Sequence, residues 1–169
     1  GWQHITLNSE RLLTRKNPHL RMDFGGIAKG FAADSMFAHF KENGFSKVMI
    51  IAGGDLRLGD PPPQQQGWTV QFLVSSVKNA KQPKPLVLAN CAVSTSGDLH
   101  QSVTIAGKKY SHIIDPSTGL GSTNTIAATV IAPSATLSDP LATASCIRPE
   151  KVKQWMKQFP GTRIILHQR

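Results

Sequence analysis

Apolar and polar residues alternate along the chain in two patterns, one typical of strands and the other of helices. Continuous apolar runs at 47–52 and 125–132 predict buried strands, and the alternation at 68–74 predicts a strand buried on one side only. Shorter apolar segments predict further strands at 2–7, 19–24, 86–89, 102–105, 109–114 and 162–167. Strands are therefore expected from one end of the chain to the other.

Three segments have the apolar spacing of helices instead. The first follows Gly25-Gly26, where the backbone can turn tightly, and its apolar residues recur at helical spacing over 27–40 before the stop signal at Asn43-Gly44. The other two helices are expected at 137–147 and 149–159.

These elements predict the fold class. A turn around Gly107 would join two strands as a hairpin, so the sheet should be at least partly antiparallel. The helix at 27–40 is flanked by strands, and so is the helical segment made of 137–147 and 149–159. This pattern favours helices that cover one face of a sheet. We predict an α+β fold, with one domain over residues 1–169 and a mixed, largely antiparallel sheet covered by helices.

Composition and charge narrow the class of protein. With 40% apolar and 17% charged residues, the chain has the composition of a globular protein. The net charge of +9 is spread along the chain, no basic run exceeds two residues, and aromatic residues are not interleaved with the basic ones. We therefore expect a solvated basic surface that helps to hold an anionic dinucleotide or to steer an acidic partner, and no nucleic-acid partner.

The cysteines and apolar runs exclude other classes. Cys91 and Cys146 are too few for a disulfide framework and lack metal-binding spacing, so we interpret them as buried structural thiols. No apolar run approaches the roughly 20 residues of a transmembrane helix, and the chain shows no signal peptide. Because the chain begins at Gly1 rather than Met, any membrane anchor is expected to lie upstream of it.

Two glycine-rich clusters follow predicted strands. Residues 23–30 place Lys29 in the first turn of a helix, where exposed amides and the helix dipole favour an anion. A purely structural turn explains this cluster about as well, and the order is not that of a P-loop. The second cluster, Gly53-Gly54-Asp55, reads more readily as a tight turn in which Asp55 caps local amides.

Two further clusters carry hydroxyl, imidazole and carboxylate groups. Residues 94–98 are dense in hydroxyls, which together with backbone amides can bind phosphate oxygens. Residues 110–119 form a predicted strand that runs into an Asp-Pro turn. Within this segment, His112 and Asp115 are equally compatible with a buried hydrogen-bonded pair and with a catalytic pair.

A fifth segment offers oxygen ligands for a metal. Asp139 and Thr143 are four residues apart, so they lie on one face of the predicted helix. A carboxylate with a hydroxyl suits magnesium, which takes its other ligands from waters and substrate phosphates. Helix capping by Asp139, with Pro140 at the first position, competes with this interpretation without excluding it.

Together these five motifs resemble, in composition and order, those of the ApbE family of flavin transferases over residues 22–143. Residues 23–30 resemble the family's D-x-G-G-I-A-K-G, residues 53–55 its G-G-D, and residues 94–98 its A-T-S-G-D. Residues 110–119 resemble Y-x-H-I-I-D-P-x-T-G and residues 138–144 the D-A-L-A-T-A run. Ser94 and Pro140 depart from the family pattern, since each replaces a small residue.

The resemblance implies a fold and an activity. The fold would be ApbE-like and related to the T-fold. The activity would be magnesium-dependent transfer of FMN from FAD to a Ser or Thr hydroxyl of an acceptor protein, with release of AMP. The alternatives are an FAD pyrophosphatase that yields FMN and AMP, and a non-catalytic flavin-binding or structural remnant. The resemblance implies that the family's N-terminal portion is missing before Gly1. It also implies a periplasmic or cell-envelope location for the protein.

The resemblance also assigns residues to roles. It implies His112 as the proton acceptor at the reacting centre, with Asp115 beside it as a second catalytic residue. The implied metal ligands are Asp139, Thr143 and the Gly26 carbonyl. The residues implied to bind FAD are Lys29, Gly54, Asp55, Thr95, Ser96, Gly97 and His112.

Overall fold

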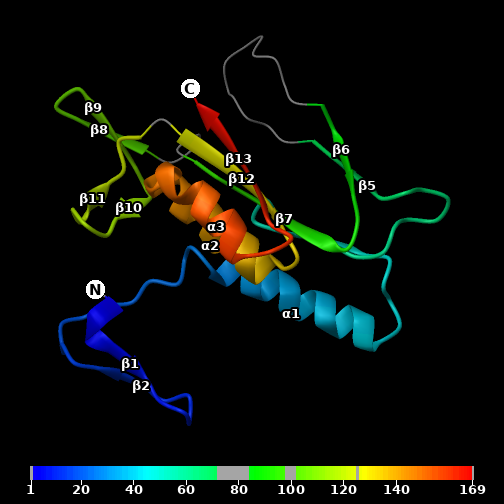
Figure 1. The fold of residues 1–169 in the computed structure, drawn as a ribbon, viewed down its shortest axis with the longest axis horizontal. Helices are drawn as coiled ribbons and strands as arrows, with labels where there is room; N and C mark the ends of the chain where they lie inside the picture. Colours follow the sequence, from blue (N-terminus) through cyan, green and yellow to red (C-terminus); the bar gives the residue numbers. More distant parts are fainter. Residues whose placement is uncertain (1, 72–83, 98–101, 125, 169) are drawn as a thin grey trace.

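A five-stranded antiparallel sheet forms the centre of the computed structural model, which describes residues 2–71, 84–97, 102–124 and 126–168 (Figure 1). The strand order is β13-β12-β7-β4-β3. These strands are β3 (Met49–Ala52), β4 (Asp55–Leu58), β7 (Cys91–Ser96), β12 (Ile126–Ala132) and β13 (Arg163–Gln168). The strand-rich α+β fold predicted from the sequence is confirmed, and all ladders among the described strands are antiparallel rather than mixed.

Short ribbons and helices surround this sheet (Figure 1). The helices are α1 (Ala28–Glu42), α2 (Ala135–Ile147) and α3 (Val152–Gln158), with 3-10 turns at Trp2–His4 and Pro149–Lys151. The two-stranded ribbons pair β1 (Ile5–Leu7) with β2 (Leu13–Arg15), β5 (Trp68–Val70) with β6 (Leu86–Leu88), β8 (Ser102–Ile105) with β9 (Lys108–Ser111), and β10 (Ile114–Asp115) with β11 (Leu120–Gly121). No helix in the described part of the chain is long and apolar enough to span a membrane.

The two faces of the central sheet pack against different layers, because successive side chains of a strand point to opposite faces. On one face Val130 of β12 and Ile164 of β13 pack against Leu141 of α2 and Val152 of α3. On the other face the core contains Val93 and Ile131 and is closed by Val70, Trp68 and Leu86 of the β5–β6 ribbon. The sheet is therefore sandwiched between helices and a ribbon.

Helix α1 packs on α2 through small residues rather than through its large apolar ones. Gly30 and Ala33 are buried, whereas Phe31 is 64% exposed and Phe40 43%. A Cβ atom at Gly30 would lie 2.1 Å from the carbonyl oxygen of Ala135, so only glycine allows this approach of the two helices. The predicted helix is confirmed, but the apolar spacing that predicted it does not mark the buried face.

Several strand predictions are wrong at their boundaries or in existence. Residues 19–24 form no strand, because the segment is largely exposed and bonds locally, with Leu20 N donating to the Asn17 carbonyl. The strand predicted over 2–7 is a 3-10 turn followed by β1, and the strand over 109–114 is interrupted at His112. The other predicted helices and strands are confirmed to within a few residues, except that 72–74 and 125 lie outside the described residues.

Helix α2 is capped from a neighbouring helix. Its own N-cap residue, Ser134, makes no side-chain cap hydrogen bond. Instead the carboxylate of Asp34 in α1 accepts hydrogen bonds from Ala135 N at 3.0 Å, Thr136 N at 2.8 Å and Thr136 Oγ1 at 2.7 Å. Arg57 of β4 lies 2.9 Å from the same carboxylate. Asp34 thus joins α1, α2 and the sheet at one point.

We expect Asp34→Ala to destabilise the fold by about 2–4 kcal/mol, because two amide donors lose their acceptor and Arg57 loses its partner. Denaturant unfolding followed by circular dichroism measures this loss. Glu42→Ala, which removes an exposed carboxylate from the end of the same helix, should change stability by less than about 0.5 kcal/mol. Equal stabilities for the two variants would contradict this account of Asp34.

Candidate active site

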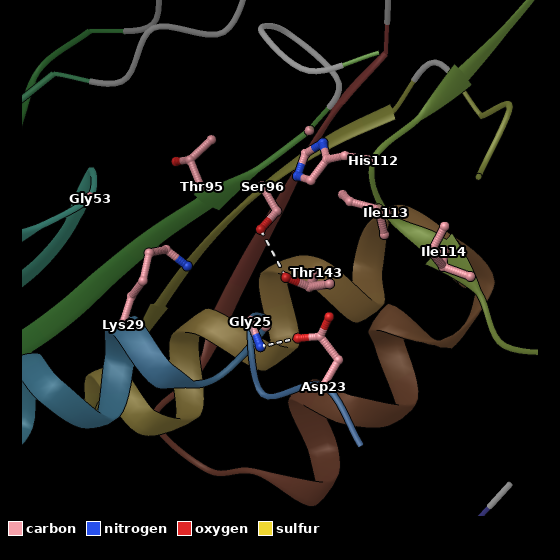
Figure 2. A pocket seen from close by; sticks show the side chains of 12 residues that line it. Asp23, Gly25, Lys29, Gly53, Thr95, Ser96, His112, Ile113, Ile114 and Thr143 are labelled. Carbon is pink, nitrogen blue, oxygen red and sulfur yellow. Dashed lines mark hydrogen bonds between the residues drawn. The ribbon is translucent and has the colours of Figure 1, made fainter. Parts of the chain in front are cut away.

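A pocket of about 720 Å³ opens where α1 begins and β7 ends, beside α2 and the turn between β9 and β10 (Figure 2). These four segments and Gly53, which follows β3, are far apart in the sequence and meet in one place. The lining residues are Asp23, Gly25, Gly26, Lys29, Gly53, Thr95, Ser96, Gly97, His112, Ile113, Ile114 and Thr143.

One wall of the pocket contains a lysine held by two buried carboxylates. Lys29 Nζ lies 2.8 Å from Asp139 Oδ1 and 3.2 Å from Asp55 Oδ2. The backbone N–H of Gly30 donates to the other oxygen of Asp139 at 3.0 Å. Both aspartate side chains are almost fully buried, whereas that of Lys29 is 40% exposed. Lys29 therefore connects the pocket to an acidic pair that lies behind its surface.

This cluster contains more negative than positive charge. Two carboxylates face one ammonium group, and within the part of the chain that the structure describes Asp55 Oδ2 makes no hydrogen bond beyond its ion pair. Burial, together with the charge of Asp139, raises the pKa of Asp55 to about 6. Burial alone would lower the pKa of Lys29, but its hydrogen bond to Asp139 and the charges of both carboxylates raise it above the ordinary value. An excess buried negative charge favours binding of a further cation.

Hydroxyl groups lie beside the acidic pair. Ser96 Oγ and Thr143 Oγ1 are 3.1 Å apart, and they join the end of β7 to α2 inside the pocket (Figure 2). A Cβ atom at Gly26 would lie 3.7 Å from Thr143 Oγ1, so the Gly26 backbone lies close to this hydroxyl. Deeper in the protein, Ser94 Oγ and Ser138 Oγ lie 2.8 Å apart and fix β7 to α2.

The groups around Asp139 are of the kind that could hold a magnesium ion. A carboxylate, a hydroxyl and a backbone carbonyl are the hard oxygen donors that this ion prefers, and each carboxylate oxygen of Asp139 retains a second lone pair. The uncompensated carboxylate charge of Asp55 beside it supports the fit. Among the described residues, no three His, Cys, Asp or Glu side chains come together as a metal cluster.

His112 lies on the opposite side of the pocket from Lys29 (Figure 2). The backbone on either side of it is paired with one residue, since Ser111 N donates to the Ser122 carbonyl at 2.9 Å and Ser122 N donates to the Ile113 carbonyl at 2.7 Å. His112 is thus the additional residue at a bulge between β9 and β10, and bulges commonly re-aim a side chain at a site. Its side chain is exposed, so the hypothesis of a buried His112–Asp115 pair is wrong.

Several predicted site residues lie outside the pocket lining. Asp115 Oδ1 accepts hydrogen bonds from Ser117 N at 2.9 Å and Ser117 Oγ at 2.7 Å, and these bonds hold the pKa of Asp115 below its ordinary value. Asp115 therefore orders the turn after His112. Gly54 does not line the pocket, although Gly53 does. Asp55 and Asp139 contact the pocket only through Lys29.

Sequence reasoning assigned no role to some residues of the lining. Asp23 Oδ1 accepts a hydrogen bond from Gly25 N at 2.7 Å and so shapes the turn that leads into α1 (Figure 2). Ile113 and Ile114 supply the apolar part of the wall. All three lie within the motifs at 23–30 and 110–119, which were the available signal, but residue chemistry alone did not distinguish lining residues from their neighbours.

The fold and the pocket define an α+β protein that presents a lysine, hydroxyls and a histidine to one cavity. The model of the ApbE family matches residues 1–166, and the chain belongs to that family. It is 30% identical over 152 residues to an FAD:protein FMN transferase of Vibrio cholerae and 28% identical over 163 residues to that of Escherichia coli K12. These alignments cover 89% and 94% of this chain but 45% and 46% of the relatives, so the chain spans about half their length.

Solved structures agree with this assignment. The ApbE protein of Thermotoga maritima superposes with a TM-score of 0.83 at 26% identity, covering 98% of this chain and 54% of that one. The apo flavinyl transferase ApbE of Pseudomonas stutzeri gives a TM-score of 0.80 at 28% identity, covering 98% and 51%. The predicted ApbE-like α+β fold is therefore confirmed.

Proposed function

We propose that this chain supplies the phosphate-binding and metal-binding part of a magnesium-dependent FAD:protein FMN transferase. Its substrates would be FAD and an acceptor protein with a Ser or Thr hydroxyl, and its products AMP and a protein that carries FMN in phosphoester linkage. The observation that carries the proposal is the pocket in which Lys29, Ser96 and Thr143 lie opposite His112, with the buried Asp139 and Asp55 behind Lys29. The location proposed for the protein is the periplasm or cell envelope.

Lys29 is proposed to bind the pyrophosphate of FAD. Its ammonium group remains partly exposed in the pocket while two carboxylates hold it in place. Its raised pKa keeps it charged at neutral pH, as charge neutralisation of the phosphates requires. The hydroxyls of Thr95 and Ser96 and the backbone of Gly97 would bind further phosphate oxygens at the end of β7.

Asp139, Thr143 and the Gly26 carbonyl would hold magnesium. When bound, the ion supplies Lewis-acid stabilisation of the charge that develops on the phosphate. The carboxylate of Asp139 is already oriented for this role, because the Gly30 N–H and Lys29 fix both of its oxygens. Ser96 orients the Thr143 hydroxyl through their hydrogen bond.

His112 is proposed to accept the proton of the attacking hydroxyl. The oxygen of the acceptor Ser or Thr would form a bond to the FMN phosphorus, the bond from that phosphorus to the AMP oxygen would break, and AMP would leave. General bases of this kind typically contribute about 10²–10⁴-fold in rate. The bulge that carries His112 and the turn ordered by Asp115 keep the ring at the pocket, so Asp115 would act by positioning.

We expect His112→Ala to reduce AMP release from FAD, magnesium and an acceptor peptide by about 10²–10⁴-fold with little loss of stability, since the side chain is exposed. Chromatography of AMP and flavin measures this, and His39→Ala, at an exposed position on α1 far from the motifs, serves as the control.

The products formed from FAD discriminate between the transferase, the pyrophosphatase and the non-catalytic interpretation. Flavin that remains bound to the acceptor supports the transferase, whereas free FMN indicates the pyrophosphatase. Absence of AMP at every magnesium concentration would overturn both activities and favour the non-catalytic flavin-binding or structural interpretation.

A further inference from the structure

Three side chains on neighbouring strands form a continuous line of hydrogen bonds that ends at the pocket. His167 Nε2 on β13 lies 3.0 Å from Thr129 Oγ1 on β12, and Thr129 Oγ1 lies 2.9 Å from Thr95 Oγ1 on β7. Thr129 is directly opposite Thr95 in the sheet, whereas His167 is opposite Ala127, one diagonal step away. All three side chains therefore lie on the same face of the sheet.

The middle residue of this line is in an unusual environment for a hydroxyl. Thr129 has no exposed surface, and the next residue on the same face of β12, Ile131, belongs to the apolar core beneath the β5–β6 ribbon. A buried hydroxyl is costly unless it is hydrogen-bonded. Thr129 has partners on both sides, and one of them, Thr95, is exposed and lines the pocket. The line therefore connects a histidine outside the pocket to a residue of the pocket lining.

Such a line has a direction, because each threonine hydroxyl has a single hydrogen to donate. If Nε2 of His167 carries a hydrogen, it donates to Thr129, Thr129 donates to Thr95, and the hydrogen of Thr95 remains available to the pocket. If Nε2 is unprotonated, it accepts from Thr129, Thr129 accepts from Thr95, and Thr95 offers only a lone pair. The state of one ring nitrogen therefore decides what Thr95 presents to a ligand.

We propose that His167 is a positioning residue which, through Thr129, makes the Thr95 hydroxyl a hydrogen-bond donor to a phosphate oxygen of the ligand. This inference rests on the proposed function, which places a pyrophosphate in the pocket. Phosphate oxygens that carry negative charge only accept hydrogen bonds, so the ligand selects the direction in which His167 Nε2 carries the hydrogen. Burial lowers the pKa of His167, so the choice lies between the two neutral tautomers of the ring.

The first experiment compares ligand binding by variants of the line in the 169-residue chain. We expect His167→Met and Thr129→Val each to raise the Kd for FAD about three- to tenfold in the presence of magnesium, because Thr95 no longer has a defined donor direction. The Kd for riboflavin, which has no phosphate, should not change. His167→Gln should retain most of the FAD affinity, since its amide nitrogen can donate from nearly the same position.

A double substitution shows whether His167, Thr129 and Thr95 act through one another or make independent contacts. Thr95→Val combined with His167→Met should bind FAD no more weakly than Thr95→Val alone, because both substitutions remove the same hydrogen bond. Melting temperatures of all variants show whether each is folded. Losses that add fully, or that affect riboflavin as much as FAD, would overturn the proposal in favour of a purely structural role.

A second measurement observes the histidine itself. Nitrogen-15 NMR of the imidazole reports which ring nitrogen carries the hydrogen, and inorganic pyrophosphate serves as the probe. We expect pyrophosphate to shift His167 toward the form protonated at Nε2 in the wild-type chain, and to have no such effect in Thr129→Val. An unchanged His167 signal in the wild type at saturating pyrophosphate would overturn the inference. A response to pyrophosphate without AMP release from FAD would overturn the proposed function alone.

Discussion

Replacing Asp139 with Asn should lower magnesium-dependent AMP release by at least about a hundredfold while the protein remains folded. The substitution preserves the shape of the side chain and one oxygen, but it removes the only negatively charged group among the proposed ligands. Lys29 retains Asp55 as an ionic partner at 3.2 Å, so the cluster changes from one excess negative charge to a balanced pair. We therefore expect a loss of stability of no more than about 1–2 kcal/mol.

Two measurements test this expectation. Thermal unfolding with and without magnesium should show a rise in melting temperature for the wild type, because a ligand that binds only the native state stabilises it. Asp139→Asn should show no rise. Glu150→Gln, which removes one exposed carboxylate, should respond to magnesium as the wild type does. A normal magnesium response of Asp139→Asn would contradict its role as a ligand.

The sequence predicted the helices and the central strands well because their signals are local. The apolar run of β12 and the Gly161 stop signal after α3 depend on residues close together in the chain. The segment at 19–24 has a strand-like alternation as well, but strand formation requires a partner, and its exposed residues bond within turns. The buried face of α1 was not predictable either, because it depends on the close approach of Gly30 to Ala135.

The candidate site, like the fold, could be predicted from the sequence only in part. The fold brings Gly26, Lys29, Ser96, His112 and Thr143 into one pocket. The family motifs had marked these five residues as candidates, and their roles stay predictions. The pattern did not reveal that Asp139 bonds Lys29 from behind the pocket wall, because their contact spans 110 residues of sequence.

The line from His167 to Thr95 has no local signature at all. It depends on the register of three strands that are distant in the chain, and register is set by tertiary packing rather than by neighbouring residues.

Asp55→Asn should stabilise the magnesium-free protein at neutral pH. The wild type buries two carboxylates against one ammonium group, and the substitution leaves Lys29 paired with Asp139 alone at 2.8 Å. Asparagine keeps the size of the side chain, so the main change is the removal of an uncompensated buried charge, which is costly. The increase in melting temperature on substitution measures the effect, and Asp60→Asn, which changes a carboxylate outside the cluster, serves as the control.

The pH dependence of this gain has a definite sign. The pKa of Asp55 rises from 3.8 to about 6 on folding, so the native state binds a proton more tightly than the unfolded state. The stability that this proton contributes is fully present below about pH 4 and is lost as the pH rises through about 6. The advantage of Asp55→Asn should therefore be largest above pH 6 and shrink below it. Magnesium should also reduce the advantage, because the ion compensates the same charge; an advantage independent of both pH and magnesium would contradict this charge balance.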